Sequence, residues 1–335
     1  MKRVILLLFL FIFSGTFVYA KERSVEVTMD FNLSAPEHAK TVKLWIPYPM
    51  SDENQDIYDV RINGNFSYHG IYRDREYGNN ILFAEWDGSN KERKLTYIFK
   101  VRRKEVITKN FPKNELPFSK AEFAKYLKSA SMLPLEGKVK DYAVKITKDK
   151  KTVLAKAKAI YDWIVENMYR DPNVKGCGLG EVERLLDTKG GKCADIHSVF
   201  VALARSVGIP AREVFGIRIP KGKDGDMTKA QHCWVEFYLP GYGWVVADPA
   251  DVRKIVLEQK IDLKQAEPYR KYYFGAVDEN RIAFGTGRDI TLNPKQHSGL
   301  LNYFGYPYAE VDGKPLNEDL YGFNIGYKIS FKEID

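Results

Sequence analysis

One cysteine follows two glycines at the point where a helix is expected to begin. The segment GGKCADIHSVFVALARSVGIPAR covers residues 190–212, and its apolar side chains recur three or four residues apart, as on one face of a helix. Gly208 and Pro210 are expected to end that helix. Cys193 would then lie in the first turn, where free N–H groups and the helix dipole favour a thiolate. The alternative is a small buried side chain that opens a core helix.

A histidine and an aspartate lie downstream on two predicted strands. A thiol nucleophile needs a base, and a histidine base needs a group that fixes its tautomer. His232 opens the strand HCWVEF, and Asp248 follows the strand GWVVA. A hairpin centred near Gly241 pairs residues whose numbers sum to about 482, which places His232 opposite Ala250. His232 and Asp248 are then expected as diagonal neighbours on one face, although a slip of one residue would turn Asp248 away.

The other cysteines and a second histidine leave alternatives open. Cys233 follows His232 directly, so strand alternation turns its side chain the other way. An odd number of cysteines is compatible with a Cys177–Cys233 disulfide or with three free thiols. His197 lies four residues after Cys193 and shares its helix face. An alternative is therefore a zinc site whose ligands are Cys193, His197 and His232. No second CxxC or HxxxH supports that site, and His197 is expected at the edge of the core or behind the site.

Helices and then strands are expected to position these residues. Helical spacing occurs at residues 123–127, after a Ser119/Glu122 capping box, and again at 139–146, 152–169 and 181–186. A period of two follows at 212–219, 232–239 and 243–247, which indicates an α+β arrangement. The chain beyond Asp248 is expected to be irregular, and Asp195 and Asp251 are expected to be solvated acids without a role.

The first part of the mature chain has the pattern of an antiparallel sandwich. Alternating apolar residues predict short strands separated by turn signals such as Asn63-Gly64 and Asp87-Gly88. The expected strands cover residues 25–33, 42–46, 57–62, 81–86 and 95–101. No cluster of titratable residues appears there, so a supporting or recognition domain is expected.

The first 20 residues are typical of a secretory signal peptide. Lys2 and Arg3 precede an apolar run at residues 4–13, and small residues lead to a cleavage site after Ala20. An uncleaved anchor is the alternative, but the apolar run is short for a membrane span. Cleavage leaves 50 basic and 44 acidic residues, a net charge of +6. These charges are interspersed, so we expect a solvated surface and no nucleic-acid module.

Taken together, these segments resemble the core domain of the transglutaminase-like superfamily. The matching features are the glycine-led Cys193, the helix that ends in GIPAR, the His-x-Trp strand QHCWVEF and the Asp-Pro of GWVVADPA. The resemblance covers residues 152–250 and extends more loosely through GRDITLNP. Each feature is common by itself, whereas the combination is specific.

The resemblance implies a papain-like site with Cys193 as nucleophile, His232 as base and acid, and Asp248 as the orienting carboxylate. It implies acyl transfer, in which the thiolate attacks an amide and an amine or water then takes the acyl group. The Cys193 N–H is the expected first oxyanion donor, with Tyr169 as a candidate second donor and Trp234 as a candidate wall of the site. No cofactor or metal is expected, and no acidic calcium loop is visible.

The expected organisation has five parts. These are a signal peptide (1–20), a β-sandwich domain (21–110), a helical connector (111–150), a transglutaminase-like catalytic core (151–295) and a tail packed on the core (296–335). We expect a periplasmic or secreted cysteine hydrolase or acyltransferase, a peptidase or amidase rather than a cross-linking enzyme, acting on peptide or protein substrates at the cell envelope. A catalytically silent envelope binding module of the same fold is the alternative.

Overall fold

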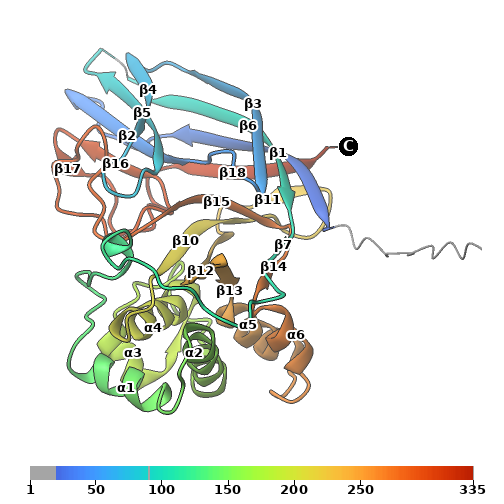
Figure 1. Ribbon diagram of the computed structural model, residues 1–335. Helices are drawn as coiled ribbons and strands as arrows, with labels where there is room; N and C mark the ends of the chain where they lie inside the picture. The colour runs from blue at the N-terminus through green and yellow to red at the C-terminus, as the bar shows by residue number, and fades with distance from the viewer. Residues whose placement is uncertain (1–19, 90, 335) are drawn as a thin grey trace, which may run out of the picture.

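The structure is a computed structural model that describes residues 20–89 and 91–334, so the predicted signal peptide lies outside the described residues except for Ala20. A β-sandwich forms one half of the molecule, and helices packed on an antiparallel sheet form the other (Figure 1). This arrangement confirms the α+β fold that the sequence predicts. In the described part of the chain, no helix has the length and apolar character needed to cross a membrane.

Two five-stranded sheets form the sandwich. The first contains, in spatial order, β11 (Asp224–Asp226), β18 (Tyr327–Glu333), β1 (Glu22–Asn32), β6 (Lys94–Lys104) and β3 (Gln55–Gly64). The second contains β17 (Lys314–Pro315), β16 (Tyr308–Val311), β2 (Thr41–Tyr48), β5 (Asn80–Asp87) and β4 (Tyr68–Arg73). Alternate residues of the facing strands are buried between the sheets, among them Val27, Leu44 and Phe99. The alternating pattern of the sequence therefore corresponds to two sheets, each with one face buried against the other and one face toward solvent.

The C-terminal tail contributes to the sandwich as well as packing on the core, where the sequence predicts it. Its strand β18 pairs with β1 and its strand β16 pairs with β2, so both ends of the chain build the sandwich. The added strands cover backbone groups of β1 and β2 that would otherwise remain at open sheet edges. Only the part of the tail around Tyr303, Tyr306 and Tyr321 contacts the core of the helical half. The tail therefore joins the two halves of the molecule.

The helical half surrounds one buried helix. The helices are α1 (Lys138–Ile146), α2 (Val153–Asn167), α3 (Val182–Thr188) and α4 (Cys193–Ser206). They pack on a sheet with the order β13 (Gly243–Ala247), β12 (Gln231–Leu239), β10 (Ala211–Arg218) and β15 (Arg281–Thr286). Every residue of α4 is buried, because α1, α2, α3, the later helix α5 (Pro249–Gln259) and the sheet contact it on different sides. The first residue of α4 is consequently held in place by most of the core.

The hairpin register agrees with the predicted one. Val235 pairs with Ala247 and Phe237 with Val245, so the residue numbers of each pair sum to 482. This register brings the first residues of β12 beside the residues that follow β13. The confirmed register is the step that places His232 and Asp248 together.

Two other expectations about elements are wrong. The chain after Asp248 is not irregular at first, because α5 (Pro249–Gln259) and α6 (Glu267–Tyr272) follow. Asp248 is the N-cap of α5 and Pro249 its first residue, which is a common pair of helix-start signals. Residues 119–127 form only the short 3₁₀ turn η1 (Ala124–Tyr126), and its N-cap makes no side-chain hydrogen bond.

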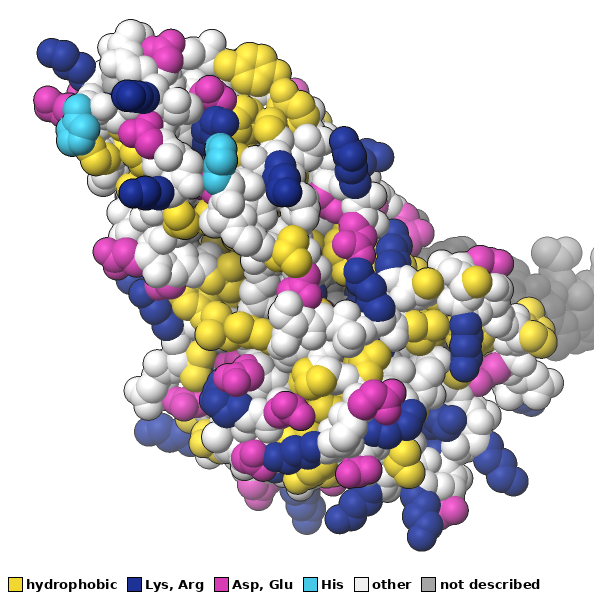
Figure 2. All heavy atoms as spheres, turned by 90° about the vertical axis from the view of Figure 1, so that its left-hand side faces the viewer, with side chains coloured by type: hydrophobic (Ala, Val, Ile, Leu, Met, Phe, Trp, Pro, Cys, Tyr) yellow, Lys and Arg dark blue, Asp and Glu magenta, His cyan; other side chains and the backbone are white. Residues whose placement is uncertain are grey.

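Short strand pairs and surface charges complete the picture. The pairs are β7 (Val106–Ile107) with β14 (Ala276–Val277), and β8 (Tyr169–Arg170) with β9 (Gly190–Gly191). Figure 2 shows one face, on which Lys and Arg are mixed with Asp and Glu over both halves. This mixture agrees with the interspersed charges of the sequence and gives that face the character of a solvated surface.

Candidate active site

Cys193 is the first residue of α4, as the sequence predicts, and only 1% of its surface is exposed. The first turn of a helix carries backbone N–H groups without intrahelical partners, so this position favours a negative sulfur. Asp195 fixes the turn, because its carboxylate accepts hydrogen bonds from the N–H of Lys192 at 3.0 Å and of Gly180 at 2.8 Å. Asp195 is therefore a buried capping residue and not a solvated acid.

Three thiols meet at this position, and all three are free. Interactions with the side chains of Cys177 and Cys233 hold the pKa of Cys193 well below its ordinary value, against the effect of burial, and His232 contributes in the same direction. The pKa of each neighbouring thiol is raised, so the negative charge belongs on Cys193. The side chains of Cys233 and His232 both contact Cys193, although the two residues are adjacent on the strand. The expectation that strand alternation turns Cys233 away from the site is therefore wrong. The raised pKa of Cys233 is the better reason to set it aside as a nucleophile.

His232 connects the thiol to a carboxylate. Its Nε2 lies 2.8 Å from Oδ2 of Asp248, which leaves Nδ1 as the nitrogen available to Cys193. Burial by itself would lower the pKa of His232, but Asp251 and Asp248 outweigh it and raise the pKa above its ordinary value. A lowered thiol pKa beside a raised imidazole pKa favours a thiolate–imidazolium pair.

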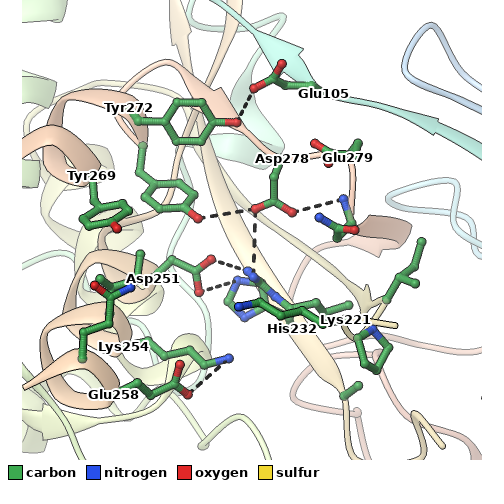
Figure 3. A pocket seen from close by; sticks show the side chains of 18 of the residues that line it. Glu105, Lys221, His232, Asp251, Lys254, Glu258, Tyr269, Tyr272, Asp278 and Glu279 are labelled. Atoms are coloured by element: carbon green, nitrogen blue, oxygen red, sulfur yellow. Dashed lines mark hydrogen bonds and ion pairs between the residues drawn. The ribbon is translucent and has the colours of Figure 1, made fainter. Parts of the chain in front are cut away.

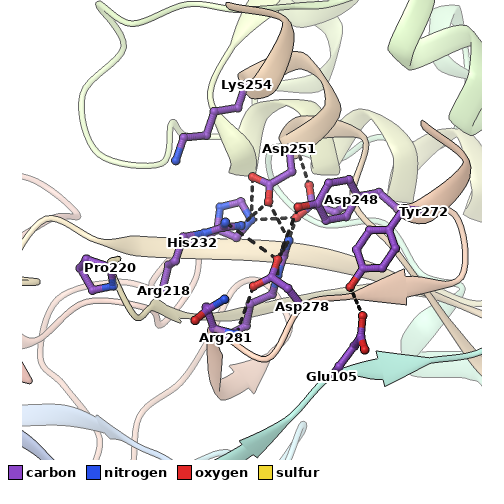
Figure 4. Close-up of polar contacts among 12 residues, drawn as sticks. Glu105, Arg218, Pro220, His232, Asp248, Asp251, Lys254, Tyr272, Asp278 and Arg281 are labelled. Carbon is purple, nitrogen blue, oxygen red and sulfur yellow. Dashed lines mark hydrogen bonds and ion pairs between the residues drawn. The ribbon is translucent and has the colours of Figure 1, made fainter. Parts of the chain in front are cut away.

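Asp248 is the centre of a larger network (Figure 4). Its Oδ1 lies 3.1 Å from Nε2 of His197 and accepts the backbone N–H of Asp251 at 2.8 Å, and its Oδ2 pairs with Arg281. Burial would raise the pKa of Asp248, but Arg281 and the imidazoles of His232 and His197 outweigh it and hold the pKa well below its ordinary value. The structure therefore brings Cys193, His232 and Asp248 together with the carboxylate charged.

Sequence reasoning missed two members of this network. Asp251 is buried, and its carboxylate pairs with Arg218 and with Arg281 at 2.7 Å. Its Oδ1 also lies 3.6 Å from Nε2 of His232, so it is not the solvated acid that was expected. Arg281 is fully buried and reaches Asp278 as well, at 2.9 Å. The one local signal was the position of Asp251 three residues after the helix cap, and no local signal marked Arg281.

The zinc alternative does not fit these contacts. The ring nitrogens of His197 face Sγ of Cys233 at 3.2 Å and Asp248 at 3.1 Å, not the thiol of Cys193. His197 thus stands behind the site, as the sequence favours. Ligand atoms of His232, Asp248 and Asp251 do lie within 4.8 Å of one another. Guanidinium groups already neutralise both carboxylates, however, so an added cation would meet positive charge.

Two further candidates occupy other surroundings. Trp234 packs with Val106, Val214 and Val246 in a separate apolar cluster, which fits a packing role. Tyr169 is 47% exposed, and its ring lies against Gly190 beside the start of α4. Its part as a second oxyanion donor stays a prediction.

The tail covers the thiols. Tyr306 hydrogen-bonds to Cys177, and the rings of Tyr306 and Tyr321 lie 5.2 Å apart in the same buried cluster as Cys193. Residues of the tail thus belong to the buried surroundings of the nucleophile candidate. The sequence did not indicate this contact.

The fold and this site define a transglutaminase-like domain, and the chain belongs to the transglutaminase-like superfamily. The family profile described as the transglutaminase-like superfamily matches residues 140–249. An uncharacterized protein of Haemophilus influenzae is 37% identical over 320 residues, which are 87% of each chain. A Cytophaga hutchinsonii protein, described as a candidate cysteine protease, has a similar crystal structure, with a TM-score of 0.55 and 16% identity over 93% of this chain and 99% of that one.

A shorter match concerns a named enzyme. A protein-glutamine gamma-glutamyltransferase of Pseudomonas aeruginosa is 33% identical over 75 residues. The match spans 19% of this chain and 10% of that protein. It supports membership in the same family.

We predict that iodoacetamide at pH 6 to 7 alkylates Cys193 well before Cys177 or Cys233. The reason is that only the pKa of Cys193 is lowered, and the thiolate is the reactive form. Peptide mapping by mass spectrometry at increasing times measures the order. Because the Cys177 hydrogen bond is the largest cause of the low pKa, Cys177→Ala should move the pH profile of alkylation upward. Equal rates at all three thiols would contradict the assignment.

Proposed function

We propose that this protein is an exported cysteine-dependent acyl-transfer enzyme that acts on amides of peptides or proteins at the cell envelope. The observation that carries the proposal is the chain of contacts from the Cys193 thiol through His232 to the charged carboxylate of Asp248. Membership in the transglutaminase-like superfamily supports the same chemistry. Hydrolysis is favoured over cross-linking, so the enzyme would be a peptidase or an amidase.

The proposed first step forms a thioester. The thiolate of Cys193 attacks the amide carbonyl, and the backbone N–H of Cys193 donates to the developing oxyanion. His232, as imidazolium, gives its proton to the leaving nitrogen as the C–N bond breaks. The products are an acyl-enzyme on Cys193 and a free amine or ammonia.

The second step releases the acyl group. His232 removes a proton from water, the hydroxide attacks the thioester carbonyl, and the C–S bond breaks to restore the thiolate. A primary amine in place of water would give a new amide instead. A cavity of about 1080 Å³ borders His232, so water can reach the residue proposed as the base, and this supports hydrolysis.

The proposal is tested with a peptide library and a labelled primary amine. The wild-type chain and Cys193→Ala are incubated with both, and ammonia, cleaved peptides and amine adducts are scored separately. We expect ammonia or cleaved peptides from the wild type only, with few adducts. A product pattern that is the same in both chains would refute a cysteine-dependent reaction.

Export is proposed from the residue pattern of the first 20 residues. If the leader is removed as predicted, the mature chain isolated from its native host begins at Lys21. Amino-terminal sequencing of the protein from cell fractions measures this directly. An intact Met1 end in a cytoplasmic fraction would contradict export.

One observation favours a catalytically silent binding module as a second candidate. Cys193 is almost fully covered, with Tyr306 and Tyr321 beside it. A silent module requires no access to the thiol. In that case Cys193→Ala would complement a deletion of the gene as well as the wild type does, and the alkylation described above would fail.

A further inference from the structure

A charged cavity of about 1080 Å³ borders the candidate active site (Figure 3). His232 and Asp251 lie on its wall, and Figure 3 shows His232 between the tyrosines Tyr269 and Tyr272 on one side and Lys221 on the other. A concave site with a few polar groups beside the reacting residues is the usual place for a substrate. The chemistry of its wall therefore bears on which substrate it takes.

The acids of this cavity are largely engaged by other residues. Asp251 and Asp278 form ion pairs with arginines. Glu258 lies 3.7 Å from Lys254. Glu105 accepts a hydrogen bond of 2.5 Å from the Tyr272 hydroxyl. Among the described residues that line the cavity, Glu279 is the acid without a partner. Four cationic side chains lack a carboxylate partner within the same described set: Lys21, Arg170, Lys221 and Lys229. The unengaged charge of the wall is positive, which favours an anionic ligand.

Arg170 is the cation best placed to contact a reacting substrate. It pairs with Gly191 across the β8–β9 ladder, two residues before Cys193. Strand spacing puts its Cα on the order of 8 to 9 Å from that of Cys193. Its side chain lines the cavity, and its Nη1 is buried without a hydrogen-bond partner. Nη1 itself is closed to water, so a ligand in the cavity would meet the other nitrogens of the guanidinium, which no carboxylate of the described chain engages.

We propose that Arg170 binds a carboxylate of the substrate, so that the enzyme prefers acidic peptides whose carboxylate lies within one or two residues of the reacting amide. This inference rests on the proposed function and names its substrate class. The guanidinium fork matches a carboxylate in geometry and charge. One extended residue spans about 3.3 to 3.6 Å, so the distance from Cys193 corresponds to a neighbouring residue of a bound peptide.

Binding is tested apart from turnover. Two pools of end-blocked hexapeptides, alike except for a fixed central Glu or Gln, are offered to Cys193→Ala, and the bound peptides are counted by affinity-selection mass spectrometry. We expect about tenfold enrichment of the Glu pool, as for one charge-assisted hydrogen bond, and a decrease with added salt. Equal recovery of the two pools would overturn the proposal.

Further substitutions in the Cys193→Ala chain assign the effect. Arg170→Gln should abolish the enrichment, whereas Arg184→Gln, which changes an exposed arginine of α3 paired with Glu181, should leave it intact. Enrichment that persists in Arg170→Gln but disappears in Lys221→Gln would overturn the role of Arg170. Arg170 Nη1 has no hydrogen bond to lose, so the melting temperature of Arg170→Gln should stay within about 2 °C of its parent.

The outcomes separate this inference from the proposed function. A wild-type chain that turns over no peptide, while the Glu pool is still enriched through Arg170, refutes the enzyme and supports the anionic site. If the turnover rate changes neither between Glu and Gln peptides nor in Arg170→Gln, the enzyme is supported and the carboxylate-binding role of Arg170 is refuted.

Discussion

Replacing Asp248 by Asn is expected to reduce kcat/KM by about 10³- to 10⁴-fold, mainly through kcat. The carboxylate accepts a hydrogen bond of 2.8 Å from Nε2 of His232 and stabilises the positive charge of the imidazolium. A neutral amide cannot stabilise that charge. Asparagine caps a helix about as well as aspartate, so α5 should keep its first turn. Steady-state kinetics on the peptide identified by the library assay measures the change.

The same substitution has a signature in the pH profile. The two carboxylates Asp251 and Asp248 raise the pKa of His232 against burial, so Asp248→Asn should lower that pKa. Fewer chains would then hold the imidazolium that keeps Cys193 as thiolate, and alkylation at pH 6 to 7 should slow. Asp262→Asn changes another turn-capping aspartate, in the segment between α5 and α6, and serves as the control. Unchanged kinetics in Asp248→Asn would remove Asp248 from the proposed mechanism.

Replacing Arg281 by Met is expected to lower the free energy of unfolding by about 3 to 5 kcal/mol. Arg281 is fully buried and pairs with Asp248, Asp251 and Asp278, so its loss leaves charged groups in a dry interior. Arg218 still faces Asp251 and cannot replace the contact with Asp248. Urea unfolding followed by circular dichroism measures the change.

Two variants serve as controls for this prediction. Arg281→Lys keeps the charge but not the fork, so it should lose less stability than Arg281→Met. Arg184→Met removes an exposed arginine paired only with Glu181, and an exposed pair contributes about 0 to 1 kcal/mol. Equal stability of Arg281→Met and the wild type would show that the carboxylates are not charged in the folded chain.

The sign of the acid dependence follows from the same ion pairs. The pKa values of Asp248 and Asp278 lie below their ordinary values, burial being outweighed by Arg281 in each case. The folded state therefore gains stability above the unfolded pKa of about 3.9 and loses it as pH falls through the lower folded pKa values. In Arg281→Met the folded pKa values rise, so stability should fall less steeply between pH 4 and 2 than in the wild type.

Local signals were sufficient for the elements that carry the candidate triad. The glycines and the apolar stripe placed Cys193 at the start of α4, and the turn at Gly241 set the register that joins His232 to Asp248. Both signals act over a few residues, so folding elsewhere does not alter them. The helix α5 was also signalled, by Asp248-Pro249, although the tyrosine-rich chain beyond it suggested irregular structure.

The surroundings of the site required the tertiary structure. Arg281 reaches Asp248 because β15 pairs with β10, a pairing between segments more than 60 residues apart. The tail contacts the thiols because β16 and β18 return to the sandwich and carry Tyr306 and the chain between them across the core. The sequence by itself determined which residues could act as thiol, base and carboxylate and the order of the helices and strands up to Asp248. Only the tertiary structure decided which charges are buried together, because the energy of a buried charge depends on partners that sheet order brings from distant parts of the chain.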